Sequence, residues 1–308
     1  MLTELSARGI SDLERGQRRY PRLETVRLIA EALALGGPVQ AELVLLSRPP
    51  TNSQDDRRGF AAPTTPAVRG PQRQVMPVLA SQLIGRAYVI SEVVEILHRA
   101  DTRLVTLTGP GGAGKSSLAI QVATQLSEAY PGGITCVFLA SIAAGASVLP
   151  AIADALGVRE TGADPLAKTL GDVLGETRFL LVLDNFEHVI NDAVAVNGLL
   201  ERCPGLDVLV TSRAALRLRI EHVFHVEPLD IPASGSLVTV DDISRFGALE
   251  LFVERVRMAS MKFDVTSDDV PIICEICRRL DGLPLAIELA AARMRVLSLG
   301  ELHEQLQD

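Results

Sequence analysis

The sequence predicts an α/β fold, in which a parallel sheet is flanked by helices, followed by a small all-α subdomain and preceded by a short helical segment. Between residues 81 and 235, short apolar runs alternate with segments of helical periodicity. This alternation is typical of crossover helices in a mostly parallel sheet. After Asp241 the strand-like runs stop and helical patterns alone continue. The length of 308 residues fits about two compact domains.

The N-terminal part, residues 1–48, predicts short helices. Val26, Ile29, Ala30 and Leu33 have helical spacing, and a second short helix is expected over Ser6–Arg15. Residues 49–80 read as an extended linker, because six of the 17 prolines lie between Pro49 and Pro77. We expect the sheet domain to span residues 81–235 and the helical subdomain to span residues 241–308.

Five apolar runs predict the strands of the sheet: Leu104–Thr108, Thr135–Ala140, Phe179–Leu183, Val208–Thr211 and Val223–Val226. Between them, helical periodicity predicts helices over Ser116–Ala129, Val148–Leu156 and Asp192–Leu200. The segment Arg219–Glu221 is expected to be a solvated turn before the last strand.

The subdomain is predicted to contain three helices. The first carries apolar residues from Leu249 to Val256, and the second from Ile273 to Leu280, with Thr266 or Ser267 as its N-cap. Gly282 and Pro284 then mark a stop and a restart into a helix over Leu285–Leu297 that is apolar on most sides. Cys274-x-x-Cys277 lies inside the second helix without a second cysteine pair, which favours buried packing over zinc or redox chemistry.

The formal net charge of −8 is unevenly distributed along the chain. Residues 1–75 hold 11 Arg against 8 acidic residues, whereas the rest of the chain is strongly acidic. An acidic body repels nucleic acid, so we expect any DNA contact to be confined to the N-terminal part. Four dispersed cysteines do not suggest a disulfide scaffold, and no signal peptide or membrane span is expected. We therefore expect a soluble, cytoplasmic protein.

The strongest chemical signal is a glycine-rich loop that fits the pattern G-x-x-x-x-G-K-[ST] in full. It consists of Gly109, Pro110, Gly111, Gly112, Ala113, Gly114, Lys115 and Ser116, and Ser117 continues it into a helix. An apolar run precedes the loop, as the strand–loop–helix unit of P-loop nucleotide-binding proteins requires. Its backbone N–H groups would surround a β-phosphate, Lys115 would neutralise β- and γ-phosphate oxygens, and Ser116 would offer a hydroxyl to Mg²⁺. The alternative is a glycine-rich turn with an incidental lysine.

A second signal is the apolar run that ends in Asp184. A carboxylate at the carboxyl end of such a strand lies beside the phosphate loop and can hold Mg²⁺ directly or through water. The alternative is an ordinary buried strand that ends in Asp. Asn185 cannot act as a base, which leaves Glu187 to orient the attacking water, unless it is a surface acid at the start of a helix.

A further apolar run, Val208–Thr211, leads through Ser212 to Arg213. The end of this strand is expected to face the γ-phosphate, so that Arg213 would report whether this phosphate is present. The alternative is a salt-bridged surface arginine.

Four segments together resemble the NB-ARC nucleotide-binding core of the STAND class of signal-transduction ATPases. They are Ile84–Arg86, Leu181–His188, Val210–Arg213 and Arg278–Ala286, and the resemblance covers about residues 81–308. It implies that Ile84, Gly85 and Arg86 line the adenine and ribose side of the pocket and that Pro284 presses on the adenine. Such proteins rest with ADP, exchange it for ATP, often self-associate, and are reset by hydrolysis.

The most similar proteins of this class are bacterial transcriptional regulators that join the core to a helix-turn-helix. Residues 5–30 look like the second half of a Cro/repressor-type (XRE) domain, whose recognition helix would begin with Ser6, Ala7, Arg8, Ser11 and Asp12. The first helix of that domain would lie before Met1, and the winged-helix domain of the family would follow Asp308. We therefore expect this sequence to be a family architecture that is cut at both ends.

Three functional hypotheses follow. The first is an ATP/ADP-binding switch in transcriptional regulation, with slow Mg²⁺-dependent hydrolysis, attached to a truncated DNA-binding segment. The second is a DNA-binding regulator whose core binds nucleotide without significant hydrolysis. The third, an unregulated P-loop ATPase or kinase acting on a small molecule, lacks a recognisable substrate pocket in the sequence.

Overall fold

The computed structural model describes residues 77, 83–143, 145–158, 165–260 and 263–306, all within one compact unit, Pro66–Asp308. The predicted helix-turn-helix of residues 1–48, with its candidate DNA contacts Ser6, Ala7, Arg8, Ser11 and Asp12, lies outside the described residues. The same is true of the predicted linker, residues 49–80, apart from Pro77.

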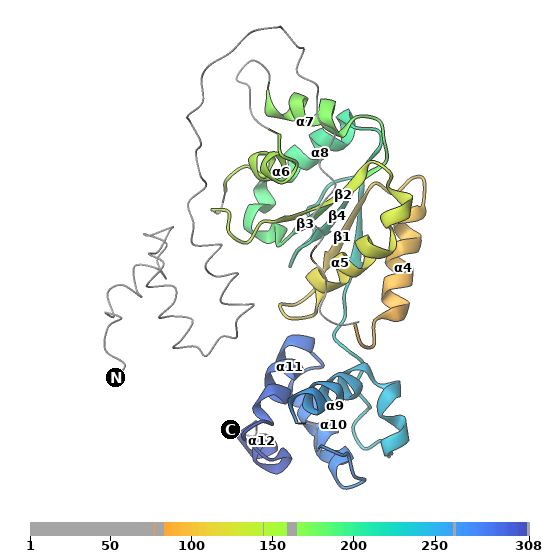
Figure 1. Ribbon diagram of the computed structural model, residues 1–308, viewed down its shortest axis with the longest axis vertical. Coiled ribbons are helices and arrows are strands. Elements are labelled where there is room, and N and C mark those ends of the chain that lie inside the picture. The colour runs from red at the N-terminus through yellow and green to blue at the C-terminus, as the bar shows by residue number, and fades with distance from the viewer. Residues whose placement is uncertain (1–76, 78–82, 144, 159–164, 261–262, 307–308) are drawn as a thin grey trace, which may run out of the picture. The chain divides into compact units, whose positions relative to one another are not determined.

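The centre of the unit is a five-stranded, fully parallel sheet with the strand order β2-β3-β4-β1-β5 (Figure 1). Its strands are β1 (Leu104–Thr108), β2 (Gly133–Phe138), β3 (Phe179–Asp184), β4 (Leu206–Thr211) and β5 (Glu221–His225). The three inner strands β1, β3 and β4 are buried along their whole length. Such continuous apolar runs are expected where both faces of a parallel sheet are covered. The predicted fold class is thereby confirmed.

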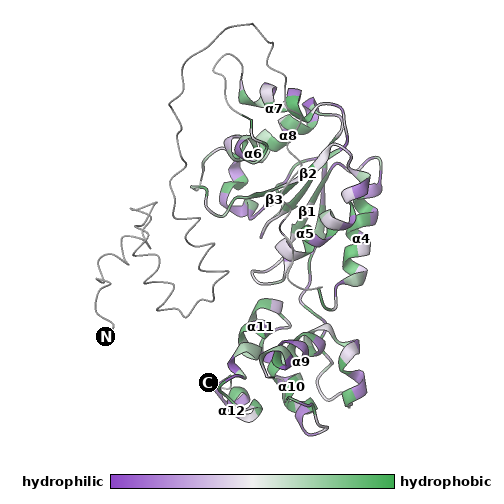
Figure 2. Cartoon of the chain, in the orientation of Figure 1, coloured by the Kyte–Doolittle hydropathy of each residue, from purple (hydrophilic) through white to green (hydrophobic). Residues whose placement is uncertain are grey.

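Helices cover both faces of the sheet. Alternate residues of a strand point to opposite faces, so Val105 and Leu107 join one core while Leu104 joins another. The first core includes residues of α4 (Ala87–His98) and α5 (Lys115–Gln125), and the second includes residues of α6 (Leu149–Ala155), α7 (Leu166–Leu174) and α8 (Ala193–Arg202). Short 3-10 helices, η1 (Ser127–Ala129) and η2 (Phe186–Asp192), follow α5 and β3. Figure 2 shows how hydrophobic the strands are.

Two details of the sheet domain differ from the sequence-based expectation. Helices α4 and α7, of 12 and 9 residues, were not predicted. The segment before the last strand is not a solvated turn throughout, since β5 already begins at Glu221. The Glu221 carboxylate accepts hydrogen bonds from the backbone N–H groups of Leu216 and Arg217, at 2.8 and 2.7 Å, and so organises the turn from within the strand.

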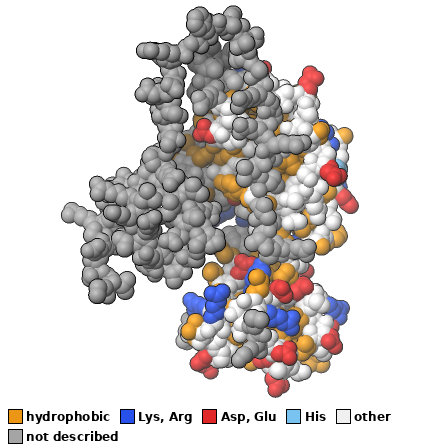
Figure 3. All heavy atoms as spheres, in the orientation of Figure 1, with side chains coloured by type: hydrophobic (Ala, Val, Ile, Leu, Met, Phe, Trp, Pro, Cys, Tyr) orange, Lys and Arg blue, Asp and Glu red, His pale blue; other side chains and the backbone are white. Residues whose placement is uncertain are grey.

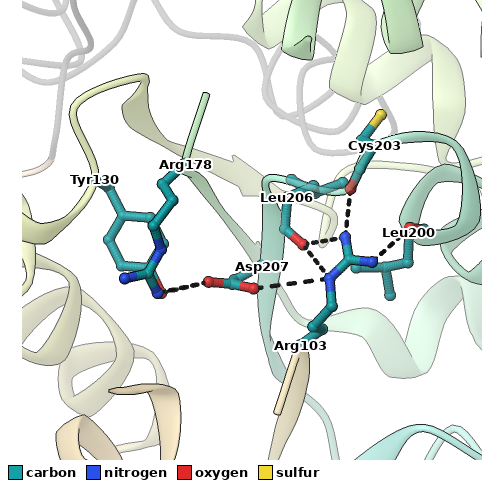
Figure 4. Close-up of polar contacts among 7 residues, drawn as sticks. All are labelled: Arg103, Tyr130, Arg178, Leu200, Cys203, Leu206 and Asp207. Atoms are coloured by element: carbon teal, nitrogen blue, oxygen red, sulfur yellow. Dashed lines mark hydrogen bonds and ion pairs between the residues drawn. The ribbon is translucent and has the colours of Figure 1, made fainter. Parts of the chain in front are cut away.

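A cluster of polar residues joins the amino ends of the strands, opposite the glycine-rich loop (Figure 4). The Tyr130 hydroxyl donates to Asp207 Oδ2 at 2.9 Å, and Arg178 Nη2 donates to the same oxygen at 3.2 Å. Arg103, which precedes β1, donates to the backbone carbonyls of Leu200, Cys203 and Leu206. Because each buried polar group has a partner, the cluster ties four strands together without an unsatisfied charge.

The helical subdomain has its own core. It contains the 3-10 helix η3 (Val240–Arg245) and helices α9 (Gly247–Ala259), α10 (Asp269–Arg279), α11 (Pro284–Arg293) and α12 (Leu299–Gln305). Ile84 and Leu229 from the sheet domain pack against or within this core. On the face that Figure 3 shows, acidic and basic side chains of the described residues are interspersed over these helices.

Three expectations for the subdomain need correction. The N-cap of α10 is Asp268, not Thr266 or Ser267; Thr266 instead donates its N–H and hydroxyl to the Asp269 carboxylate, at 2.9 and 2.7 Å. Helix α11 ends at Arg293 and not at Leu297, and one side of it, with Leu285 and Leu289, is exposed. A further helix, α12, was not predicted. As expected, Cys274 and Cys277 are buried free cysteines in α10.

None of the helices that the structure describes is long and apolar enough to cross a membrane.

Candidate nucleotide-binding site

The glycine-rich loop curls around the amino end of α5. Gly109, Gly112 and Gly114 all have positive φ values, of 148°, 81° and 88°, which residues with a Cβ atom rarely adopt. A Cβ on Gly109 would lie 2.6 Å from the carbonyl oxygen of Val226. Gly114 is the N-cap of α5, so the free N–H groups of the first helical turn open toward the inside of the loop. This backbone cradle fits a phosphate group.

Lys115 bridges the loop from inside. Its Nζ donates to the carbonyl oxygens of Gly109 and Pro110, at 2.9 and 2.8 Å, and its side chain is buried. Burial lowers the pKa of Lys115 from its usual value, while the nearby charges of Glu187 and Asp184 raise it and that of Arg213 lowers it. The ammonium group is therefore positioned among the predicted charged residues of the site, held by backbone oxygens.

Asp184 ends β3 and is buried. In the sheet, β4 lies between β3 and the loop-bearing strand β1, so the end of β4 separates the carboxylate from the loop. The Thr211 hydroxyl of β4 donates to Asp184 Oδ1, and the Asn185 N–H donates to Thr211 Oγ1 at 3.0 Å. Thr211 was not singled out from the sequence as a residue with a role of its own. The signal that the sequence offered for Thr211 was a hydroxyl residue at the end of one apolar strand, together with an aspartate at the end of another.

Glu187 and Arg213 form an ion pair, with 3.2 Å between Arg213 Nε and Glu187 Oε1. The Glu187 side chain is only 19% exposed, so it is not a surface acid, and its Oε2 is buried without a hydrogen-bond partner. Arg213 is 71% exposed and salt-bridged, as expected for the alternative interpretation, a surface arginine. It also lines the pocket. Both predicted charged residues thus meet beside the phosphate loop.

A pocket of about 340 Å³ extends from the loop to the helical subdomain. Its lining includes these predicted site residues: Ile84, Arg86, Gly111, Gly112, Ala113, Gly114, Lys115, Ser116, Ser117, Glu187, Arg213 and Pro284. Gly109 and Pro110 line a second hollow, which Arg213 shares. Neither Gly85 nor Asp184 is in contact with the first pocket. Gly85 packs against Gly247 instead, and a Cβ there would lie 2.7 Å from the Gly247 Cα atom.

Arg86 lines the pocket, as the resemblance implied, and also has a structural role. Its Nη2 donates to the carbonyl oxygens of Ala113 and Glu227, at 3.1 and 2.7 Å. Burial lowers the pKa of Arg86, and the charge of Asp230 raises it. The guanidinium therefore ties the glycine-rich loop to the segment after β5, and its role in the structure is to hold the loop.

The helical subdomain closes one side of the pocket. The Leu285 N–H donates to the Gly112 carbonyl oxygen at 3.2 Å, and the position of a Cβ on Gly114 lies 3.9 Å from Pro284 Cγ. Leu251 and Arg255 of α9 and Glu288 of α11 also line the pocket and were missed from the sequence. Helical spacing alone could not show that these faces turn toward the loop.

The donor set fits a nucleotide with Mg²⁺. The described residues contain no cluster of three or more His, Cys, Asp and Glu side chains that could hold a metal by themselves. Mg²⁺ at nucleotide sites, however, uses one or two protein oxygens together with phosphate oxygens and water. The Ser116 hydroxyl and the Asp184 carboxylate are oxygens of this kind, and the positive-φ glycines leave the loop open to phosphate.

Part of this chain is similar to known proteins. Residues 86–221 match the NB-ARC domain family. The chain is 38% identical over 251 residues to an uncharacterized protein of Mycobacterium tuberculosis strain H37Rv, a match that covers 81% of this chain and 60% of that protein. It is 37% identical over 210 residues to a protein of the same strain named as an HTH-type transcriptional regulator, covering 68% of this chain and 22% of that protein.

The regulatory protein AfsR of Streptomyces griseus is 29% identical over 283 residues, which cover 88% of this chain and 26% of AfsR. This chain thus spans about 60% of the length of the first relatives and less of the others. Among solved structures, a STAND protein with a tetratricopeptide repeat sensor from Pyrococcus horikoshii matches with a TM-score of 0.44 and 16% identity. That match covers 75% of this chain and 33% of the other.

Proposed function

Because residues 86–221 match the NB-ARC domain family, we propose that this chain is an ATP/ADP-binding switch in transcriptional regulation. The observation that carries the proposal is the contact between Leu285 of α11 and Gly112 of the glycine-rich loop. A nucleotide in this pocket touches both the sheet domain and the helical subdomain. The number of its phosphates can therefore change how the helices are held.

Most of the predicted site residues have a role in this switch. The loop from Gly109 to Ser117 binds the phosphates through backbone N–H groups, and Lys115 turns from the loop carbonyls to the β- and γ-phosphate oxygens. Mg²⁺, when bound with the nucleotide, offsets phosphate charge. Ser116 and Asp184 hold this ion, and Thr211 keeps the Asp184 carboxylate in place. Ile84 and Pro284, which both line the pocket, contact the base.

Hydrolysis in this site is expected to be slow. Glu187 is the carboxylate that can orient a water, but in this structure its Oε1 is paired with Arg213. A base that is engaged by a cation accepts a proton less readily. When ATP is bound, Arg213 leaves Glu187 for the γ-phosphate, and Glu187 becomes available. Turnover then returns the switch to its ADP state.

A second candidate is a DNA-binding regulator whose core binds nucleotide without significant hydrolysis. The relatives named as HTH-type transcriptional regulators favour DNA binding, and the Glu187–Arg213 pair favours weak turnover. DNA contact would come from the N-terminal segment, with self-association in the ATP state. The four free cysteines fit a reducing cytoplasm.

The first experiment is to identify the nucleotide that the purified chain retains. Denaturing the protein is expected to release ADP, and Lys115→Ala is expected to abolish retention. Lys168→Ala, a lysine on α7 that does not line the pocket, is the matched control and retains ADP. If the wild-type chain neither retains nucleotide nor hydrolyses ATP, the switch is excluded.

DNA binding separates the two candidates further. A shift of duplex DNA that falls steeply with salt, and that Arg8→Ala or Arg18→Ala weakens, is expected if the N-terminal segment contacts DNA. Arg257→Ala, an exposed residue on α9, serves as the control. If DNA binding occurs without measurable ATP turnover, the second candidate replaces the first.

A further inference from the structure

A second ion pair lines the nucleotide pocket, on the side of the helical subdomain. Arg255 Nε of α9 lies 3.0 Å from Glu288 Oε1 of α11, and both residues belong to the pocket wall. Their side chains are 21% and 41% exposed, so the pair lies at the pocket surface and not within the helical core. Pairs that remain partly in water contribute little to folding stability. The pair is therefore placed where it can meet a ligand.

The positions of the two residues along their helices locate the pair within the pocket. Arg255 is one helical turn beyond Leu251, which belongs to the same apolar cluster as the pocket residues Ile84 and Leu229. Glu288 is likewise one turn beyond Pro284, which lies next to Gly114 of the phosphate loop. Because a turn is only about 5.4 Å long, the pair faces the part of a nucleotide between its base and its phosphates.

The chemistry of Glu288 selects what it can bind there. A carboxylate is repelled by phosphate oxygens but accepts hydrogen bonds from hydroxyl groups. It offers about four acceptor positions, of which the hydrogen bond from Arg255 Nε uses one. The part of a nucleotide that lies between base and phosphates and carries hydroxyl donors is the ribose. Acidic residues bind ribose hydroxyls in the same way in dinucleotide-binding folds.

We infer that Glu288 recognises the ribose hydroxyls of the bound nucleotide and that Arg255 is a positioning residue which holds its carboxylate in place. This inference rests on the proposed function, because it requires that the pocket bind a nucleotide. It assigns to helices α9 and α11 the discrimination between ribonucleotides and deoxyribonucleotides. The glycine-rich loop, which binds phosphates alone, cannot make this distinction.

The test compares the affinities of the purified full chain for ADP, 2′-deoxy-ADP, 3′-deoxy-ADP and IDP by calorimetry. The wild-type chain is expected to bind ADP about tenfold more tightly than at least one deoxy analogue. Glu288→Ala is expected to bring this ratio close to one while the ratio of ADP to IDP stays unchanged. Glu254→Ala, an exposed acid on α9 outside the pocket, keeps the wild-type ratios. Arg255→Met reduces the ribose ratio, and Arg255→Lys restores part of it.

Each other outcome overturns the inference in a distinguishable way. If wild type binds ADP and Glu288→Ala keeps the ribose ratio, Glu288 does not read the ribose and the switch still stands. If Glu288→Ala changes the ratio of ADP to IDP instead, the carboxylate reads the base. If the wild-type chain binds none of the four nucleotides, the inference and the proposed function both fail. Glu288→Gln, which keeps the side-chain volume, replaces the alanine variant should that variant not fold.

Discussion

Arg213, just beyond the end of β4, pairs with Glu187 of η2 beside the glycine-rich loop, with 3.2 Å between Nε and Oε1. The pair joins the residue proposed to detect the γ-phosphate to the residue proposed to orient water. While the pair holds, Arg213 Nε and Glu187 Oε1 are engaged with each other. Breaking the pair is therefore expected to be a step of the nucleotide response, and two variants test its two halves.

Glu187→Gln removes the carboxylate and leaves Arg213 without its counter-ion. We expect ATP to bind at least as tightly as in wild type, since Arg213 is then available to the γ-phosphate. Hydrolysis is expected to fall by about 100-fold, because a general base contributes roughly 10²–10⁴-fold. Phosphate release under single-turnover conditions measures the effect. Hydrolysis at the wild-type rate with normal ATP binding would exclude Glu187 as the base.

Arg213→Ala removes the cation that is proposed to distinguish ATP from ADP. Charge-assisted hydrogen bonds contribute about 1.5–3 kcal/mol, so the affinity for ATP is expected to fall roughly tenfold to hundredfold. The affinity for ADP should change little, which titration with both nucleotides measures. Arg219→Ala, an exposed arginine before β5, is the control. An equal loss for ADP and ATP would show that Arg213 does not sense the third phosphate.

Thr211→Val removes a hydroxyl but keeps the side-chain shape. That hydroxyl donates to Asp184 and accepts from the Asn185 N–H, both in the buried end of the sheet. Leaving these groups without their partner is expected to lower the free energy of unfolding by about 1–3 kcal/mol. Urea denaturation measures this change, and the Mg²⁺ concentration needed for ATP binding should rise as well. Thr177→Val, at an exposed position, should leave both quantities unchanged. No effect of Thr211→Val on either one would contradict the role given to the hydroxyl.

The environment of Tyr130 leads us to expect that the free energy of unfolding changes with pH in the alkaline range. Burial raises the pKa of Tyr130 above its ordinary value, and the charge of Asp207 adds to the shift. The folded chain therefore keeps the phenol proton that the unfolded chain releases above about pH 10. The stabilisation is fully present below pH 10 and is lost with rising pH, by about 1.4 kcal/mol per pH unit for one proton.

Tyr130→Phe should therefore be less stable than wild type near neutral pH but lose less stability between about pH 10 and 11. Tyr88→Phe is the matched control, because Tyr88 is exposed and should leave the pH dependence as it is. Urea denaturation at several pH values distinguishes the two variants. Identical pH profiles for wild type and Tyr130→Phe would refute the prediction.

Local patterns in the sequence were sufficient for the phosphate loop and for the framework of the sheet. The spacing from Gly109 to Ser116 allows few other structures, and the inner strands are recognisable as continuous apolar runs. Short or partly exposed elements such as α7 and α12 were missed, because their periodicity is too brief to stand out. The N-cap of α10 was misplaced, since Thr266 and Asp268 are both good capping residues and only the fold distinguishes them.

The sequence by itself determined which residues form the loop that is proposed to bind phosphate, because the glycine-rich loop and its lysine are contiguous in the chain. Only the tertiary structure decided what surrounds them. The strand order places Thr211 between Asp184 and the loop, Arg86 holds the loop through two carbonyl oxygens, and Arg255 and Glu288 meet from two separate helices. The physical reason is that these contacts join residues far apart in the chain. Their geometry follows from how helices and strands pack, and no short-range spacing encodes it.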